Sequence, residues 1–178
     1  MKHLVKFYFF LFILPTPSYG LGIFSSEPLP TVKEVSLDRY AGKWYAIAAL
    51  PQIFTIGCVA QTADYEKLSD TSINVINTCI KNDGSITDIE GVAKVTEAPG
   101  VLSLQFNTWW SQLFNIKADY NIIKLDKDYK YALIGGKNRL SLWFLSRTKT
   151  VSNTVYFEYI NYADELGFNT KKLKDSEF

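Results

Sequence analysis

Three short segments, far apart along the chain, constrain its fold more than any other feature: Gly42–Tyr45, Lys127–Tyr129 and Trp143–Arg147. An up-and-down β-barrel that starts and ends at the same pole brings such segments together. The glycine lets the backbone turn tightly into the first strand, and the tryptophan closes the barrel floor. The arginine of the last strand can then lie over the indole as a cation–π partner. None of the three segments is specific alone, but their order and spacing are.

Eight segments with strand character follow one another with short links: 43–50, 59–68, 72–80, 86–96, 101–106, 120–125, 129–134 and 140–147. Turn residues separate them, most clearly Asn82-Asp83-Gly84 and Pro99-Gly100. The pattern predicts an all-β fold, a closed eight-stranded antiparallel barrel whose interior can hold one small ligand. Ser152 can cap a helix over 153–166 that Gly167 ends, and its apolar positions at helical spacing place this helix outside the barrel.

The chain resembles the lipocalin family, and within it the branch that holds the bacterial lipocalins and apolipoprotein D. The resemblance is carried by Leu37–Ala48, Gly91–Val95, Leu125–Gly135 and Leu142–Thr148. It implies an eight-stranded antiparallel up-and-down lipocalin β-barrel with a C-terminal α-helix packed outside. One departure is Lys127, where the family often has threonine, and it concerns the floor loop rather than the cavity. The residues expected to carry the structural motif are Gly42, Trp44, Asp128, Tyr129 and Arg147.

The first 20 residues have the features of a secretory signal peptide. Basic Lys2 and Lys6 precede an apolar run over 7–14, and small residues precede a cleavage expected near Gly20. The apolar run is too short to span a bilayer. A lead-in over 21–34 and one lipocalin domain over 35–178 should follow. Some bacterial relatives carry a lipobox cysteine just after the apolar run; since this chain has none there, we expect a secreted or periplasmic protein.

Cys58 and Cys79 are the only cysteines. Two cysteines in an exported domain most often form a disulfide. A hairpin turn near 69–71 puts them on neighbouring antiparallel strands, far from the turn. Two buried free thiols remain the alternative.

The residue types present argue against catalysis. The only histidine, His3, lies in the predicted signal peptide, which removes serine–histidine and cysteine–histidine nucleophiles, most zinc sites and a histidine-ligated haem. The strand carboxylates Asp64, Asp88 and Glu90 are assigned to the solvent face. The net charge of +1 gives no reason to expect a nucleic-acid partner. We therefore predict no enzyme activity, no cofactor and no metal.

Alternation along the strands defines a candidate cavity. Ala63 and Tyr65 share one face of their strand, and Trp143 and Leu145 share the face of Arg147. Resemblance to apolipoprotein D independently implies aromatic ligand contacts at Tyr65, Phe106, Tyr120 and Trp143. The alternative is that these side chains fill the barrel as an ordinary core. The predicted ligand-binding residues are Phe54, Ala63, Tyr65, Phe106, Tyr120, Ile122, Trp143 and Leu145.

The function that the resemblance implies is storage or transport of a lipid, either a fatty acid or a lysophospholipid, linked to envelope or membrane maintenance. One alternative is a lipocalin-fold enzyme that acts on a lipid or isoprenoid. Another is a binder of a pigment or terpenoid.

Two loops predicted at the open end are unusually apolar. The first holds Ile53, Phe54 and Ile56, and the second holds Trp109 and Trp110 followed by Lys117. Loops usually face water, so this concentration needs an explanation. The loops either fold inward over the ligand, pair two copies of the chain as a homodimer, or contact a membrane transiently through Trp109 and Trp110.

Overall fold

The computed structural model describes residues 27–113, 115 and 117–178. The predicted signal peptide and its cleavage near Gly20 lie outside the described residues, as do the side chains of Trp109 and Trp110.

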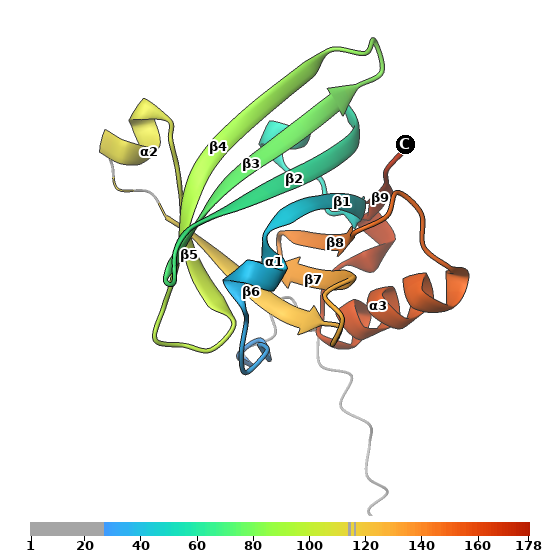
Figure 1. Ribbon diagram of the computed structural model, residues 1–178. Helices are drawn as coiled ribbons and strands as arrows, with labels where there is room; N and C mark the ends of the chain where they lie inside the picture. The colour runs from blue at the N-terminus through green and yellow to red at the C-terminus, as the bar shows by residue number, and fades with distance from the viewer. Residues whose placement is uncertain (1–26, 114, 116) are drawn as a thin grey trace, which may run out of the picture.

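A closed antiparallel barrel forms the body of the protein (Figure 1), as predicted. Its strands are β1 (Gly42–Ala49), β2 (Cys58–Ser69), β3 (Ser72–Lys81), β4 (Ile86–Val95), β5 (Val101–Phe106), β6 (Ala118–Leu125), β7 (Tyr131–Gly135) and β8 (Leu142–Ser146). Each strand pairs with the next, and β1 pairs with both β8 and β2. The pairing of β1 with both neighbours closes the barrel.

The seam between β1 and β2 is completed by the C-terminus. Direct pairing runs only from Gly42 opposite Tyr65 to Tyr45 opposite Thr62. Beyond it, β9 (Lys174–Asp175) pairs with β1, and the amide of Glu177 donates to the carbonyl of Val59 on β2 at 2.8 Å. The C-terminal segment therefore supplies backbone hydrogen bonds where the two strands separate. The sequence analysis did not predict this strand, because two residues carry no periodicity.

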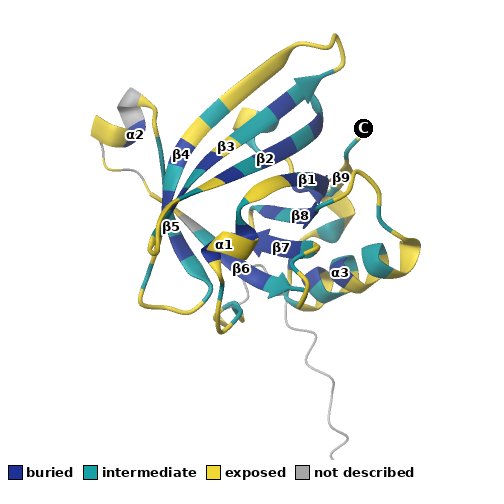
Figure 2. Cartoon of the chain, in the orientation of Figure 1, coloured by how far each residue is buried: buried dark blue, intermediate teal, exposed yellow. Residues whose placement is uncertain are grey.

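The C-terminal helix α3 (Asn153–Glu165) lies outside the barrel, beside β7 and β8 (Figure 1). As expected, the Ser152 hydroxyl accepts from the amide of Val155, and Gly167 has a left-handed φ of 85°. Tyr159 stacks on Phe144 of β8 with ring centroids 4.7 Å apart. The buried stripe of α3 (Figure 2) thus covers the outward face of the barrel and leaves the interior to other residues.

Three strand starts differ from the prediction by two residues. β6 begins at Ala118 rather than at 120. β7 begins at Tyr131 rather than at 129, because the Asp126 carboxylate accepts hydrogen bonds from the amides of Asp128, Lys130 and Tyr131. β8 begins at Leu142 rather than at 140, because the side chain of Asn138 accepts from the amide of Leu140. In both turns a side chain takes backbone donors that the ladder would otherwise use.

Four short helical segments complete the part of the fold that the structure describes. They are α1 (Leu37–Tyr40), η1 (Ile53–Thr55), α2 (Trp109–Leu113) and η2 (Thr170–Lys172). α1 lies under one end of the barrel, whereas η1 follows β1 at the other end.

Candidate functional site: the barrel cavity

The barrel floor is closed by Trp44, as predicted. Its indole is fully buried, and its Nε1 donates to the Tyr40 carbonyl at 2.8 Å. The guanidinium of Arg147 lies over the indole ring, 3.9 Å from its centroid. The predicted cation–π contact is therefore present.

Arg147 also joins the two ends of the barrel chain through backbone carbonyls. Its Nη1 donates to Lys43 at 2.9 Å, and its Nε donates to Tyr129 at 3.2 Å. Its Nη2 reaches the carbonyls of Arg39, Tyr40 and Ala41 at 2.8, 3.1 and 2.9 Å. The hydrogen bonds of the guanidinium are thus all made to residues of the floor.

Gly42 allows the close approach of Arg147. Its φ of 93° is left-handed, and a Cβ at this position would lie 3.3 Å from Nη1 of Arg147. A side chain here would therefore be strained and would crowd the guanidinium.

The two residues of the Asp128-Tyr129 motif differ in role: Tyr129 contacts the floor, whereas Asp128 lies at its edge. The Tyr129 hydroxyl accepts from the amide of Ser36 at 2.9 Å, and its ring carries the Arg39 guanidinium at 4.2 Å. The Asp128 carboxylate makes a long ion pair of 3.8 Å to Lys130. The carboxylate that organises this loop is Asp126, which the sequence analysis did not single out. Its position just before a predicted turn could have identified it, because aspartate side chains often accept hydrogen bonds from the backbone amides of a turn.

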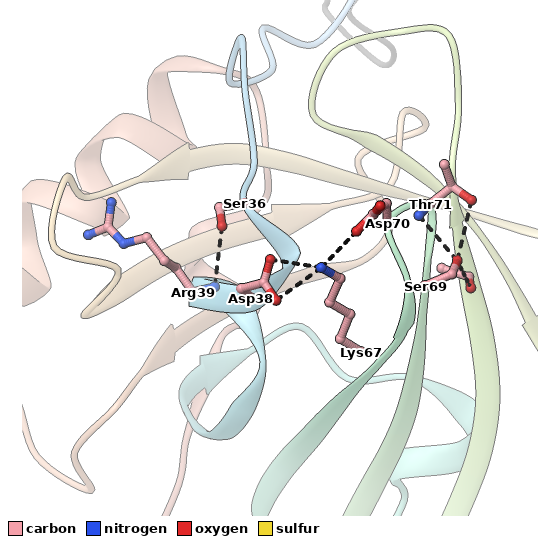
Figure 3. A network of polar contacts seen from close by, with 8 residues as sticks. Ser36, Asp38, Arg39, Lys67, Ser69, Asp70 and Thr71 are labelled. Carbon is pink, nitrogen blue, oxygen red and sulfur yellow. Dashed lines mark hydrogen bonds and ion pairs between the residues drawn. The ribbon is translucent and has the colours of Figure 1, made fainter.

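A second set of contacts fixes α1 to the β2–β3 turn (Figure 3). Lys67 on β2 binds the carboxylate of Asp38 on α1 at 2.8 Å and that of Asp70 in the turn at 2.9 Å. Ser36 caps α1 by accepting from the amide of Arg39. The two aspartates are exposed, so these ion pairs orient the floor more than they stabilise it.

Above the floor lies a cavity of about 260 Å³. The structure places seven of the eight predicted ligand-binding residues along it. These are Phe54, Ala63, Tyr65, Phe106, Tyr120, Trp143 and Leu145. The eighth, Ile122, does not line the cavity: it is fully buried in the core cluster that contains Trp44. Strand alternation gave the correct face for Ile122 but not its depth, because only the upper part of the barrel interior is hollow.

An aromatic group from a loop narrows the cavity mouth. Phe54 of η1 lies roughly parallel to Trp143, with centroids 6.5 Å apart and an interplanar angle of 18°. It also approaches Phe106, at 6.3 Å. Phe54 is still 49% exposed. It therefore covers part of the opening while one face stays accessible.

The cavity wall is mostly apolar, and its polar side chains include several threonines, Asn77, Gln61, Asp88 and two tyrosines. Near the mouth, Gln61 accepts from Nε1 of Trp143 at 3.4 Å, and the exposed Asp88 belongs to the lining. Asp88 faces solvent, as expected, but it also borders the opening. The other two strand carboxylates are engaged outside: Asp64 pairs with Lys43 and Glu90 accepts from Asn74.

At the deep end, three tyrosine hydroxyls meet. The hydroxyl of Tyr120 on β6 lies 2.7 Å from that of Tyr65 on β2 and 2.7 Å from that of Tyr40 on α1. Burial raises the pKa of Tyr65 to about 12 and raises the pKa values of Tyr40 and Tyr120 well above their usual range. All three phenols are therefore protonated at neutral pH. The sequence analysis identified two of them, Tyr65 and Tyr120, but did not single out Tyr40.

Cys58 and Cys79 form the predicted disulfide between β2 and β3, with Cα atoms 5.3 Å apart. Cys79 also lines the cavity. Disulfides are typical of proteins in oxidising compartments.

Within residues 27–113, 115 and 117–178, no cluster of His, Cys, Asp and Glu side chains is arranged to hold a metal ion. No helix in that part of the chain is both long and apolar enough to cross a membrane.

Comparison with known proteins agrees with this geometry. The outer membrane lipoprotein Blc of Escherichia coli is 35% identical over 160 residues, which cover 89% of this chain and 84% of that protein. Apolipoprotein D of Rattus norvegicus is 34% identical over 160 residues, which cover 83% of this chain and 81% of that protein. Among solved structures, insecticyanin of Manduca sexta superposes with a TM-score of 0.66 at 17% identity, with 85% of each chain covered.

The family model for the lipocalin-like domain matches residues 35–177. This match spans the whole barrel, α3 and the C-terminal segment that completes the seam. The chain belongs to the lipocalin family, whose members bind small hydrophobic ligands.

Proposed function

We propose that this protein binds a single-chain lipid, a fatty acid or a lysophospholipid, in the barrel cavity and stores or carries it in the service of envelope or membrane maintenance. The observation that carries the proposal is the cavity itself: a hollow of about 260 Å³, closed at the floor by Trp44 and lined by aromatic and aliphatic side chains. This volume lies just below the usual range for ligand pockets, roughly 300–1,000 Å³. One acyl chain suits it better than two.

Binding should depend on chain length. Each methylene removed from water contributes about 0.8 kcal/mol, which corresponds to about fourfold in affinity. Affinity for a series of saturated fatty acids should therefore rise by about this factor per methylene until the cavity is full. Quenching of Trp143 fluorescence offers a direct readout. A series without saturable binding would overturn the carrier proposal.

Two substitutions test the location of the site. Trp143→Ala and Tyr65→Ala each remove an aromatic wall, so affinity should fall by about tenfold or more. Phe157→Ala is the matched control, because Phe157 is an exposed aromatic residue on α3, away from the cavity. Circular dichroism checks that all three variants keep the barrel. Equal affinity in the cavity variants and the control would place the ligand elsewhere.

An enzyme acting on a lipid or isoprenoid, and a pigment or terpenoid binder, are the competing functions. Incubation of the purified protein with a bound lipid, followed by mass spectrometry, separates carrier from enzyme: a carrier returns the lipid unchanged. A visible absorption band in the protein as isolated would favour a pigment instead.

We also propose that the mouth docks on a bilayer, so that lipid passes without crossing water. In support, Ile53 is 89% and Ile56 is 74% exposed, and both flank Phe54 at the opening. The neighbouring β7–β8 turn adds the exposed Leu140, whose carbonyl accepts from the side chain of Gln52 at 2.9 Å. Apolar groups at a rim can enter the headgroup region, and the exposed Lys117 suits anionic lipid.

Vesicle flotation tests this docking. Ile53→Ser with Ile56→Ser, and separately Trp109→Ser with Trp110→Ser, should abolish binding to anionic vesicles while affinity for dissolved fatty acid changes little. Phe157→Ser, an exposed aromatic residue far from the mouth, serves as control. Unchanged flotation together with loss of a dimer in sedimentation would assign the rim to a homodimer contact instead.

Export from the cytoplasm is part of the same proposal. The disulfide supports it, because such bonds persist in oxidising compartments. The Escherichia coli relative is by name a lipoprotein, whereas both cysteines of this chain are used in the disulfide. We therefore propose a secreted or periplasmic protein that is cleaved near Gly20; N-terminal sequencing of the exported protein tests the cleavage.

A further inference from the structure

Asn77 places a carboxamide on the inner wall of the cavity, beside side chains that lack strong hydrogen-bonding groups. It lines the cavity on β3, half-buried, and its cross-strand neighbours are Ala63 on β2 and Ile89 on β4. The inward residues before and after it on β3 are Val75 and the disulfide-bonded Cys79. In the part of the chain that the structure describes, the Asn77 side chain makes no hydrogen bond. Its amide therefore remains open to a ligand.

The cavity reaches deeper than Asn77. One inward step below it on β3 lies Val75, opposite Tyr65 of β2. Tyr65 belongs to the tyrosine triad at the deep end, together with Tyr40 and Tyr120, whose hydroxyls hydrogen-bond to one another. One inward step is two residues, about 7 Å along a strand. A lipid chain that enters as far as the triad therefore passes Asn77 part-way along its length.

A plain acyl chain is a poor match for this wall. Water can hydrate the Asn77 amide while the cavity is open, but a chain that fills the cavity displaces this water. A methylene group offers neither a donor nor an acceptor, so the amide would be buried without a partner. Such a loss costs more than an ordinary hydrogen bond contributes. A ligand with a polar group of its own at this depth avoids the cost.

The chemistry of the wall indicates which polar group fits. A carboxamide both donates and accepts, and so does a hydroxyl group. A carboxylate or phosphate at this depth would be a buried charge without a counter-ion. None of the described lining residues is a lysine, arginine or histidine, and the one charged lining residue, Asp88, is itself acidic. A neutral hydroxyl is therefore the better partner for Asn77.

We propose that Asn77 recognises a neutral hydroxyl group of a single-chain lipid, at middle depth in the cavity. This inference rests on the proposed lipid binding and adds a selectivity to it. The hydroxyl has two possible sources. It belongs either to a chain that is hydroxylated part-way along, with the methyl end at the tyrosine triad, or to a glycerol head that enters the barrel first.

Matched lipids distinguish the two sources. Octadecanoic acid and 12-hydroxyoctadecanoic acid form the first pair, because the hydroxyl of the second lies several carbons from the methyl end and suits a step of about 7 Å. In 3-hydroxyoctadecanoic acid the hydroxyl lies beside the carboxylate, so this acid should bind no more tightly than octadecanoic acid. Methyl dodecanoate against 1-dodecanoylglycerol tests entry by a glycerol head. Displacement of a fluorescent fatty acid from the full chain measures each affinity.

Replacement of Asn77 should move the two affinities of a pair in opposite directions. Asn77→Leu has a similar size but no polar group, so octadecanoic acid should bind it about fivefold more tightly than it binds the wild type. The 12-hydroxy acid should bind more weakly, and the ratio of the two affinities should change by about tenfold or more. Asn77→Ala should change the ratio in the same direction.

Asn74→Leu is the matched control. It makes the same substitution on the same strand, but Asn74 faces outward and donates to Glu90 on the exterior. The ratio should therefore stay at the wild-type value. Thermal unfolding shows whether each variant keeps the barrel, and the ratio cancels any general loss of binding.

The outcomes separate this inference from the proposed function. A preference in the acid pair that Asn77→Leu removes assigns the hydroxyl to the chain, and the same result in the glycerol pair assigns it to the head. If octadecanoic acid binds saturably but neither ratio differs between the wild type and the two Asn77 variants, the inference fails while lipid binding stands. An equal gain from the 3-hydroxy acid would also overturn it. If no lipid binds saturably, the proposed function fails.

Discussion

Replacement of Arg147 tests whether the floor serves stability rather than ligand choice. In Arg147→Ala the indole of Trp44 loses a cation–π partner now 3.9 Å away, worth about 0.5–2 kcal/mol. Five hydrogen bonds to carbonyls are also lost. The exposed carbonyls of Arg39 and Lys43 regain water, and the carbonyl of Tyr40 keeps its hydrogen bond from Trp44. The carbonyls of Ala41 and Tyr129 lose their donor, and we count about 2 kcal/mol for these two lost hydrogen bonds.

The total is a loss of about 3 kcal/mol in the free energy of unfolding. For a domain of this size it corresponds to a fall in Tm of about 6–12 °C. Urea unfolding followed by tryptophan fluorescence measures it. Arg147→Lys should lose about half as much, because an ammonium keeps the charge but cannot reach carbonyls on both sides of the floor. Lys171→Ala, which removes an exposed cation from η2, is the control.

Affinity for a fatty acid should stay within about threefold of wild type in Arg147→Ala, because the guanidinium lies below Trp44 and does not line the cavity. The refuting result is a variant with full stability and lost binding. It would mean that Arg147 acts on the ligand and that the floor is held by other contacts.

Three further outcomes are expected. Cys58→Ser with Cys79→Ser should lower the free energy of unfolding by about 3 kcal/mol on the chain-entropy model, and alkylation of both thiols in native, unreduced protein would contradict the disulfide. Gly42→Ala should cost about 1–2 kcal/mol in urea unfolding, since its φ of 93° is left-handed; no loss would mean that the turn relaxes freely. The pKa of Tyr65 is raised from about 10 to about 12 in the folded protein, so the unfolded chain loses this proton first and stability should fall by about 3 kcal/mol between pH 10 and 12. Tyr65→Phe should make that dependence shallower, and an equal slope in both proteins would show that Tyr65 titrates normally.

The barrel and its floor could be read from the sequence because their signals are local. Alternation places Ala63 and Tyr65 on one face whatever the rest of the chain does, and Pro99-Gly100 is a turn signal in the local sequence. The disulfide followed from the same logic, because a hairpin turn fixes which residues of its two strands are neighbours. Trp44 and Arg147 were paired by resemblance together with the requirement that the first and last strands meet.

The tertiary structure decided how deep a side chain lies in the barrel and which residues far apart in the chain meet. Ile122 has the inward face that alternation gave it, yet it lies in the filled part of the barrel, because the floor helix and its neighbours occupy that level. The tyrosine triad joins α1, β2 and β6, and no local pattern relates three residues so far apart in the chain. The same holds for β9, whose two residues form a strand only because β1 and β2 separate beside it. A sequence sets which way each side chain points, but only the closed barrel sets which of them meet and where space is left between them.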